Sequence, residues 1–118
     1  MIEIDPDEKL LAEIFGVRGM EIDPAFENVL EEIGDLHAKK SRDYGTTTDP
    51  YANIRATAGW GIKPWLGALV RAGDKVARLQ QFARSGTLAN ESAEDSLLDL
   101  ATYAVIALVL LREERNEP

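Results

Sequence analysis

Carboxylates recur at helical spacing just before the most apolar stretch of the chain. Glu91, Asp95 and Asp99 follow one another in steps of four residues, which places them on one face of a helix. An almost unbroken apolar run from Leu100 to Leu111 comes directly afterwards. Acidic groups beside such a run are costly to bury unless they pair with cations or hold a metal ion. We therefore expect the functional site to include this stretch.

Basic side chains recur on the helical stretch that precedes it. Arg71, Lys75 and Arg78 lie at i, i+4 and i+7, on the same side as Asp74. A connection of about five residues joins the two stretches, so the helices should pack antiparallel. That register sets Asp74 level with residues 99–103. Carboxylates and cations at one depth suit a metal ion held by acids, with basic groups neutralising phosphates.

The same charges also have a simpler interpretation as ion pairs. Asp74 and Arg78 can pair within their helix, and Arg78 can pair with Asp95 across the hairpin. Glu91 stands at the start of its helix, where an acid favours the helix dipole without any catalytic role. Spacing alone leaves both interpretations open.

The composition limits the kind of metal that could be present. The chain has no cysteine and a single histidine, His37, so thiolate sites and zinc sites with several histidines are excluded. A metal site would be built from oxygen ligands, which indicates Mg²⁺, with Mn²⁺ as the alternative. The net charge of -8 argues against a protein that binds nucleic-acid polymers.

Helix signals divide the chain into four helical segments. Prolines and capping residues mark the starts, and glycines mark the ends. The predicted helices are a short one within residues 1–20, one from Pro24 to about Asp43, one from Pro64 to Ser85, and one from Asn90 or Ser92 to about Arg112. Because no strand pattern occurs, we expect an all-α, four-helix bundle-like fold in one domain, residues 1–118, with its core at about 24–112.

Apolar patterning predicts which faces of the last two helices are buried. In the helix from Pro64 the predicted buried stripe consists of Leu66, Leu69, Val70, Gly73, Val76 and Ala77. The last helix is apolar on nearly every side, so we expect it to be buried on several sides. Four helices in one chain cannot easily cover such a helix, so we expect a homo-oligomer, a dimer or a tetramer.

The segment at 45–63 has no clear periodicity and predicts a long loop. It contains Tyr51, Arg55 and Trp60, which could cover a substrate as a lid. A plain connector is the alternative interpretation.

The N-terminal sequence MIEIDPDEKLLAE lacks the basic and apolar regions of a signal peptide. The apolar run near the C-terminus is shorter than the roughly 20 residues that span a membrane. We therefore expect a cytoplasmic protein with no membrane partner.

Three segments resemble a known protein family. Residues 39–45 (KKSRDYG), 71–79 (RAGDKVARL) and 94–104 (EDSLLDLATYA) resemble phage-encoded proteins of the nucleotide modification associated domain 1 family. That family is similar to the all-α nucleoside triphosphate pyrophosphatases of the MazG and dimeric dUTPase type. The resemblance covers about residues 26–112, and it implies the MazG-like all-α architecture.

The resemblance also implies a metal-dependent chemistry. In MazG-like enzymes, acidic motifs on two helices bind Mg²⁺, and water attacks the metal-bound triphosphate to release pyrophosphate and a nucleoside monophosphate. Asp99 resembles the acid of the second motif, with Asp95 one turn earlier, and Asp74 stands for the first motif. Unlike the family pattern, Asp74 has no second acid at i+3 or i+4.

The leading hypothesis is a Mg²⁺-dependent nucleoside triphosphate pyrophosphohydrolase. The predicted catalytic and metal-binding residues are Asp74, Asp95 and Asp99, with Glu91 as a further metal ligand. The predicted substrate-binding residues are Lys40, Asp43, Tyr44, Trp60, Arg71, Lys75, Arg78 and Tyr103.

Two further hypotheses belong to other classes of protein. The missing acid beside Asp74 favours a nucleotide-binding or sequestering protein without catalysis. The apolar last helix would also suit a structural module that oligomerises. If the chain is phage-encoded, its compartment would be the host cytoplasm.

Overall fold

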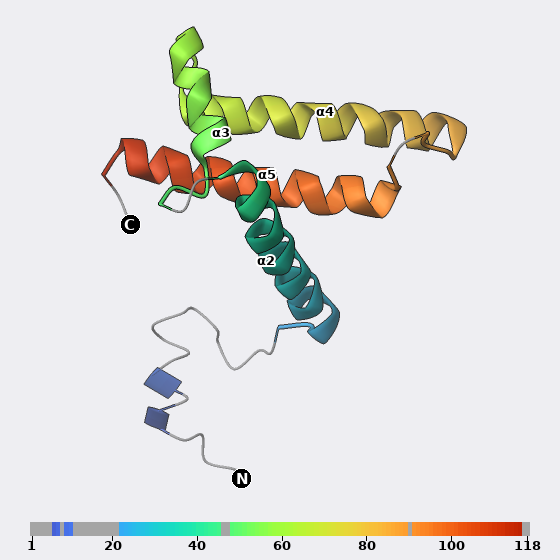
Figure 1. Ribbon diagram of the computed structural model, residues 1–118. Coiled ribbons are helices and arrows are strands. Elements are labelled where there is room, and N and C mark those ends of the chain that lie inside the picture. Colours follow the sequence, from blue (N-terminus) through green and yellow to red (C-terminus); the bar gives the residue numbers. More distant parts are fainter. Residues whose placement is uncertain (1–5, 8, 11–21, 46–47, 90, 117–118) are drawn as a thin grey trace. The chain divides into compact units, whose positions relative to one another are not determined.

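The computed structural model describes residues 6–7, 9–10, 22–45, 48–89 and 91–116, and of Tyr44 only the backbone (Figure 1). The described part is helical and contains no strand, so the predicted all-α class is confirmed. Its elements are α2 (Pro24–Tyr44), α3 (Ala52–Arg55), the 3₁₀ helix η1 (Ala56–Trp60), α4 (Pro64–Ser85) and α5 (Ala93–Glu114).

The chain contacts separate into two compact units, residues 1–30 and residues 31–118, which are described one by one. The second unit holds the C-terminal part of α2 and all later elements. The predicted helix within residues 1–20 lies mainly outside the described residues. The single-domain interpretation stays a prediction.

The ends of the long helices follow from local sequence. Pro64 stands in the first turn of α4, where a proline costs no hydrogen bond. Gly86 ends that helix with a left-handed φ of 75°, a conformation that glycine adopts without strain. Ser92 caps α5, and its hydroxyl accepts a hydrogen bond from the backbone N–H of Asp95 at 3.0 Å. The predicted bounds of these helices are therefore confirmed to within a few residues.

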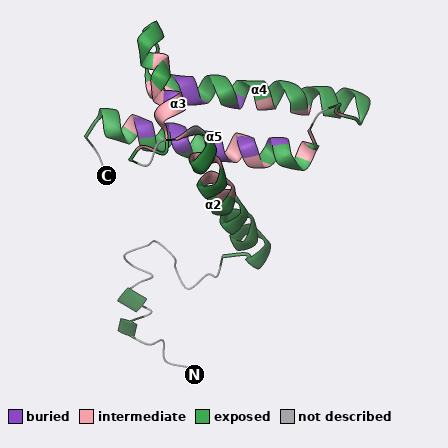
Figure 2. Ribbon diagram, viewed as in Figure 1, coloured by how far each residue is buried: buried purple, intermediate pink, exposed green. Residues whose placement is uncertain are grey.

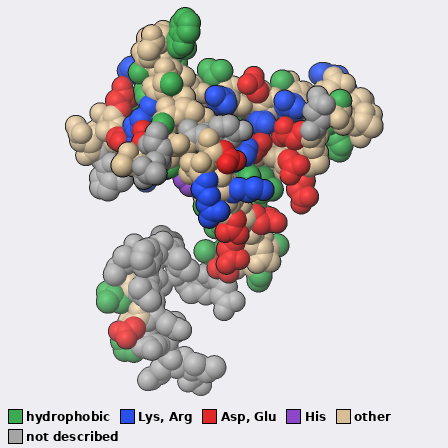
Figure 3. All heavy atoms as spheres, in the orientation of Figure 1, with side chains coloured by type: hydrophobic (Ala, Val, Ile, Leu, Met, Phe, Trp, Pro, Cys, Tyr) green, Lys and Arg blue, Asp and Glu red, His purple; other side chains and the backbone are tan. Residues whose placement is uncertain are grey.

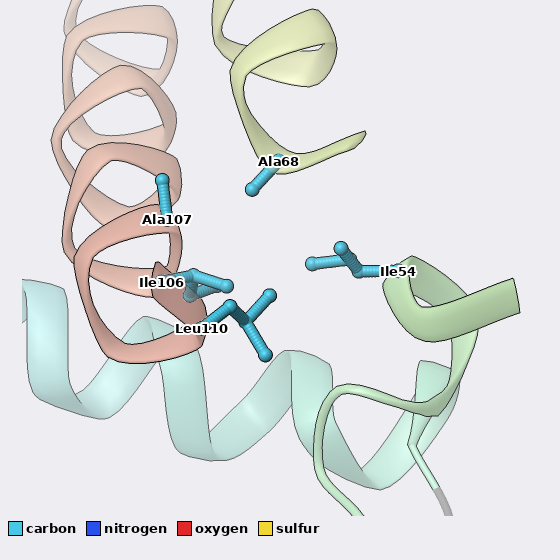
Figure 4. Close-up of a cluster of buried hydrophobic side chains, with 5 residues drawn as sticks. All are labelled: Ile54, Ala68, Ile106, Ala107 and Leu110. Atoms are coloured by element: carbon cyan, nitrogen blue, oxygen red, sulfur yellow. The ribbon is translucent and has the colours of Figure 1, made fainter. Parts of the chain in front are cut away.

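The helices α4 and α5 run antiparallel and pack side by side along their length, as predicted (Figure 1). The single-turn helix α3 and η1 pack against the start of α4. Buried side chains from α3, α4 and α5 point toward one another and form the core of the second unit (Figure 4). These are Ile54, Ala68, Ile106, Ala107 and Leu110.

The buried face of α4 differs from the prediction. The buried residues are Gly67, Ala68 and Ala72, whose small side chains let neighbouring elements approach closely. The larger aliphatic residues of the predicted stripe lie on another side of the helix and are 39% to 62% exposed. We call this exposed set the outer stripe of α4: Leu66, Leu69, Val70 and Val76.

The helix α5 is buried on one side rather than on several. Its buried residues are Ser96, Asp99, Thr102, Ile106, Ala107 and Leu110. Figure 2 shows buried positions distributed along α5, which packs against α4. The opposite side of α5 exposes Leu97, Val105, Leu108 and Val109. The second unit thus leaves an apolar face uncovered on each of its two longest helices.

The segment at 45–63, predicted as a loop, contains the two short helical elements α3 and η1. Ion pairs of Arg55 anchor this segment to α5. Arg55 pairs with Asp49 of the same segment at 2.8 Å and with Glu113, near the end of α5, at 2.6 Å. The guanidinium of Arg55 also lies 5.8 Å from the centre of the Tyr51 ring. Single helical turns are too short to produce a periodic pattern, which is why the sequence did not predict them.

None of the described helices is long and apolar enough to cross a membrane.

Candidate functional site

Five charged side chains meet where the end of α2 and the middle of α4 approach the start of α5. They are Lys40 from α2, Lys75 and Arg78 from α4, Glu91 just before α5, and Asp99 within α5. We call this group the charged cluster. Each of the five is among the residues that the sequence predicts for the site.

Asp99 is the most buried member of the charged cluster. It lies on the face of α5 that carries the core, and its carboxylate receives two ammonium groups. The Nζ atom of Lys40 is 2.7 Å from Oδ1, and that of Lys75 is 2.9 Å from Oδ2. Burial by itself would raise the pKa of Asp99, but the hydrogen bonds from the two lysines outweigh burial and lower this pKa below 3.8. Asp99 is therefore held as a carboxylate.

Lys75 bridges the two acids of the charged cluster. Its Nζ atom lies 3.1 Å from Oε2 of Glu91 and 2.9 Å from Oδ2 of Asp99. Burial acts to lower the pKa of Lys75, yet its hydrogen bonds to Asp99 and Glu91 raise this pKa above 10.5. Glu91 also accepts a hydrogen bond from the hydroxyl of Ser96 at 2.9 Å and pairs with Arg78 at 3.5 Å.

The charged cluster contains three cations and two carboxylates, so it carries an excess of positive charge in a chain with a net charge of -8. Basic and acidic side chains intermingle along the visible face of the α4–α5 hairpin (Figure 3). A local positive excess is suited to an anionic ligand, and Lys75, the most buried of the three cations, is the one least screened by solvent.

The carboxylates of the charged cluster are also the candidate ligands of a metal ion. Within residues 22–45, 48–89 and 91–116, no three carboxylate or histidine side chains are grouped as ligands of one ion. Glu91 and Asp99 nevertheless contact the same cationic atom, the Nζ of Lys75. Mg²⁺ is commonly held by one or two carboxylates together with substrate phosphates and water. This pair therefore fits a shared, substrate-dependent metal site and does not fit an all-protein one.

Several predicted site residues lie apart from the charged cluster. Asp74 and Asp95, both proposed as metal ligands from the sequence, are exposed. In the described part of the chain neither side chain has an ion-pair partner. Arg71 and Asp43 are also exposed, and Trp60 is 87% exposed. The side chain of Tyr44 lies outside what the structure describes.

Sequence reasoning did not identify Ser96 as part of the site. This serine is fully buried and donates to Glu91. A usable signal existed, because Ser96 and Asp99 are three residues apart and so share a helix face. The sequence also offered Asp95 as the acid paired with Arg78, whereas the structure pairs Arg78 with Glu91.

A small hollow of about 30 Å³ adjoins the charged cluster on the side of Asp99. Its walls come from the end of α2, from α3 with the residues before it, and from the middle of α5. The lining residues are His37, Lys40, Ser41, Pro50, Asn53, Ile54, Asp99, Thr102, Tyr103 and Ile106. Tyr103, which the sequence predicts as a substrate-binding residue, is thus placed next to Asp99 and Lys40. We refer to this feature as the hollow.

Comparison of the chain with protein-family models, with curated proteins and with solved structures gives no match.

Proposed function

We propose that this protein is a Mg²⁺-dependent nucleoside triphosphate pyrophosphohydrolase with a MazG-like architecture, acting in the cytoplasm. The observation that carries the proposal is the position of the Lys75 ammonium between the carboxylates of Glu91 and Asp99. Two acids that converge on one cation can converge on a divalent ion when the ammonium is drawn away. The resemblance inferred from residues 39–45, 71–79 and 94–104 would imply the same reaction, by way of the MazG-like enzymes to which the nucleotide modification associated domain 1 family is similar.

In this proposal, the phosphates of a bound triphosphate are a second set of anionic partners for the cations of the charged cluster. The phosphates of a bound triphosphate compete with Glu91 and Asp99 for Lys40, Lys75 and Arg78. Each ammonium or guanidinium that turns to a phosphate oxygen neutralises substrate charge and releases a carboxylate. Substrate binding and the exposure of Glu91 and Asp99 to a metal ion are thereby coupled.

The reaction adds water across the anhydride bond between the α- and β-phosphates. A bond forms between the water oxygen and the α-phosphorus, and the bond to the bridging oxygen breaks. Pyrophosphate leaves with the electron pair, the nucleoside monophosphate remains, and the proton of the water passes to solvent. Mg²⁺, when bound, supplies neutralisation of the phosphate charge and activation of water. Glu91 and Asp99 would hold it, while Lys40, Lys75 and Arg78 stabilise charge on the leaving group.

Release of pyrophosphate is the test of this proposal. Purified protein is incubated with Mg²⁺ and a panel of common and modified nucleoside triphosphates, and pyrophosphate is measured. At least one substrate should be cleaved, and both Asp99→Asn and Glu91→Gln should lower kcat by about a hundredfold or more, because loss of an outer-shell partner of a metal already costs about 10–100-fold. Helical circular dichroism should persist in both variants.

The matched control is Glu32→Gln, which neutralises an exposed acid of α2 that lies outside the charged cluster. Its activity should equal that of the unmodified protein. Asp74→Asn distinguishes two possible sets of metal ligands. Loss of activity in this variant would support the set predicted from the sequence, which includes Asp74. Full activity of Asp99→Asn would refute the proposal.

A second candidate function is nucleotide binding without hydrolysis. The observation that favours it is the double pairing of Asp99, whose two oxygens are both occupied by lysine ammonium groups. A carboxylate held in this way exchanges its partners for a metal ion only at a cost in free energy. This candidate predicts that nucleotides raise the melting temperature while no pyrophosphate appears.

We also propose that the chain self-associates. The outer stripe of α4 and the residues Leu97, Val105, Leu108 and Val109 of α5 expose aliphatic side chains on both long helices of the hairpin. Soluble monomers seldom leave large contiguous apolar patches in water. A second copy of the chain presents the same faces, and a two-fold axis can pair the outer stripe of α4 with its counterpart.

A further inference from the structure

The hollow has polar side chains that the charged cluster does not use. In the part of the chain that the structure describes, no hydrogen bond involves the imidazole of His37, the carboxamide of Asn53 or the hydroxyl of Tyr103. All three residues are half-buried and line the hollow. Half-buried polar groups without protein partners are available to a ligand, and their hydrogen bonds gain strength when water is displaced.

Asn53 supplies both kinds of hydrogen-bonding group. A carboxamide presents an oxygen acceptor beside an NH₂ donor. The polar edges of nucleobases likewise present donors and acceptors next to one another, which is the basis of amide–base recognition. In the charged cluster, by contrast, donors and acceptors belong to separate side chains that are paired with one another. Asn53 sits on the single-turn helix α3, which Arg55 anchors to the end of α5.

His37 gives the hollow a rigid aromatic wall. Its ring stacks on that of Tyr51 with centroids 5.5 Å apart and an angle of 22° between the planes. Tyr51 in turn packs against the core cluster. A ring supported in this way keeps its position when a flat ligand approaches.

The hollow and the charged cluster are continuous. Lys40 and Asp99 belong to both, and Lys75 and Glu91 lie on the other side of Asp99. A volume of about 30 Å³ holds a water molecule rather than a heterocycle. A base would therefore lie across the mouth of the hollow and direct one polar edge inward, with its phosphates extending toward Lys75 and Arg78.

We propose that the hollow is the nucleoside subsite of the protein, in which Asn53 binds the polar edge of the base and Tyr103 contributes a further hydrogen bond. This inference rests on the proposed binding of a nucleoside triphosphate at the charged cluster. It assigns base selection to Asn53 of α3 and Tyr103 of α5, which are separate from the residues proposed to bind phosphate.

Calorimetric titration of the full chain distinguishes the two subsites. The first probe is inorganic tripolyphosphate, which has no nucleoside. The second is a panel of nucleoside triphosphate analogues in which a methylene group replaces the oxygen between the α- and β-phosphates and so prevents cleavage. The protein should bind at least one analogue roughly tenfold more tightly than tripolyphosphate, the effect of one or two hydrogen bonds. Asn53→Ala should remove most of that preference and leave the affinity for tripolyphosphate unchanged.

Two further variants keep the test decisive. Tyr103→Phe removes only a hydroxyl, so it should fold normally and reduce the nucleoside preference a few-fold. Gln80→Ala removes an exposed carboxamide of α4 and should change neither affinity. Retention of the full preference in both Asn53→Ala and Tyr103→Phe would overturn the nucleoside subsite while phosphate binding stands. Failure of the unmodified protein to bind either probe would overturn the proposed function, and this inference with it.

Discussion

At the scale of single residues, Asp99 connects three helices, of which α2 is distant in the chain from the other two. Its carboxylate joins α5 to Lys40 of α2 and to Lys75 of α4. The two lysines differ in environment, because the side chain of Lys75 is 15% exposed while that of Lys40 is 37% exposed. Solvent screens the Lys40 pair more strongly, so the pair with Lys75 contributes more to stability.

The contribution of these two ion pairs should appear in the pH dependence of the free energy of unfolding. The pKa of Asp99 is lowered in the folded protein, so its pairs stabilise the fold above pH 3.8 and are lost as the pH falls through the lowered pKa. The pKa of Lys75 is raised, so its contribution is complete below pH 10.5 and is lost as the pH rises through the raised pKa. We expect a plateau of stability between these limits.

Asp99→Asn tests this account by thermal and urea unfolding across that pH range. At pH 7 the variant should be less stable by about 1–3 kcal/mol, because Lys75 keeps only Glu91 as a partner. Its melting temperature should also fall less steeply below pH 4. Some acid dependence should remain, since Asp49 also has a lowered pKa, through its hydrogen bond from the Tyr51 backbone and its contacts with Arg55. An acid dependence identical to that of the unmodified protein would contradict the assignment.

At the scale of elements, small residues set how closely α4 packs. A Cβ atom added to Gly67 would lie 2.8 Å from Oγ1 and Cγ2 of Thr57, in η1. Thr57 cannot easily move away, because its hydroxyl donates to the backbone oxygen of Ile54 at 2.9 Å and contacts that of Ile62 at 3.2 Å. The close contact between α4 and η1 therefore depends on a glycine at this position.

Gly67→Ala should accordingly destabilise the protein by about 1–3 kcal/mol, the usual range for overpacking. Gly34→Ala is the matched control, since an added Cβ there meets no atom within 4 Å and α2 gains a better helix former. This control should leave the free energy of unfolding unchanged or raise it by about 0.5–1 kcal/mol. Chemical unfolding measures both, and equal effects of the two substitutions would show that the packing at Thr57 is unimportant.

At the scale of the whole molecule, the uncovered apolar faces favour assembly. The outer stripe of α4 lies on a different side of that helix from the charged residues Arg71 and Arg78. Association through the stripe would therefore leave the charged cluster and the hollow open to ligands. An assembly of this kind buries aliphatic surface at about 25 cal/mol per Å², enough to hold two small helical chains together when the patch is extensive.

Mass measurement by light scattering tests self-association. The unmodified chain should have a mass that is a multiple of 13.0 kDa, and Val70→Asp should shift it toward that of the monomer, because an ionised carboxylate within the outer stripe is costly to bury. Phe82→Asp is the control, since Phe82 is also apolar and exposed, at 40% against 62% for Val70, but lies about 120° around α4 from Val70. A monomer at every concentration, or an equal response to both substitutions, would argue against the outer stripe as the interface.

Helix identities and bounds could be predicted from the sequence because local rules decide them. Pro64, Gly86 and Ser92 act within one turn of their own position, through a fixed φ, a left-handed φ and a side-chain cap. The shared face of Ser96 and Asp99, two buried residues of α5, follows from their spacing in the same way. These features need no knowledge of what lies opposite.

Only the tertiary structure decided which apolar face of α4 is buried and which cations meet Asp99. Periodicity gives the angle of a residue around its own helix, and it assigned the larger aliphatic residues to the core. Close packing instead buried Gly67 and Ala68, because small residues allow η1 and α5 to approach. Lys40 and Asp99 are 59 residues apart, so their contact depends on the placement of whole helices, which no local pattern encodes.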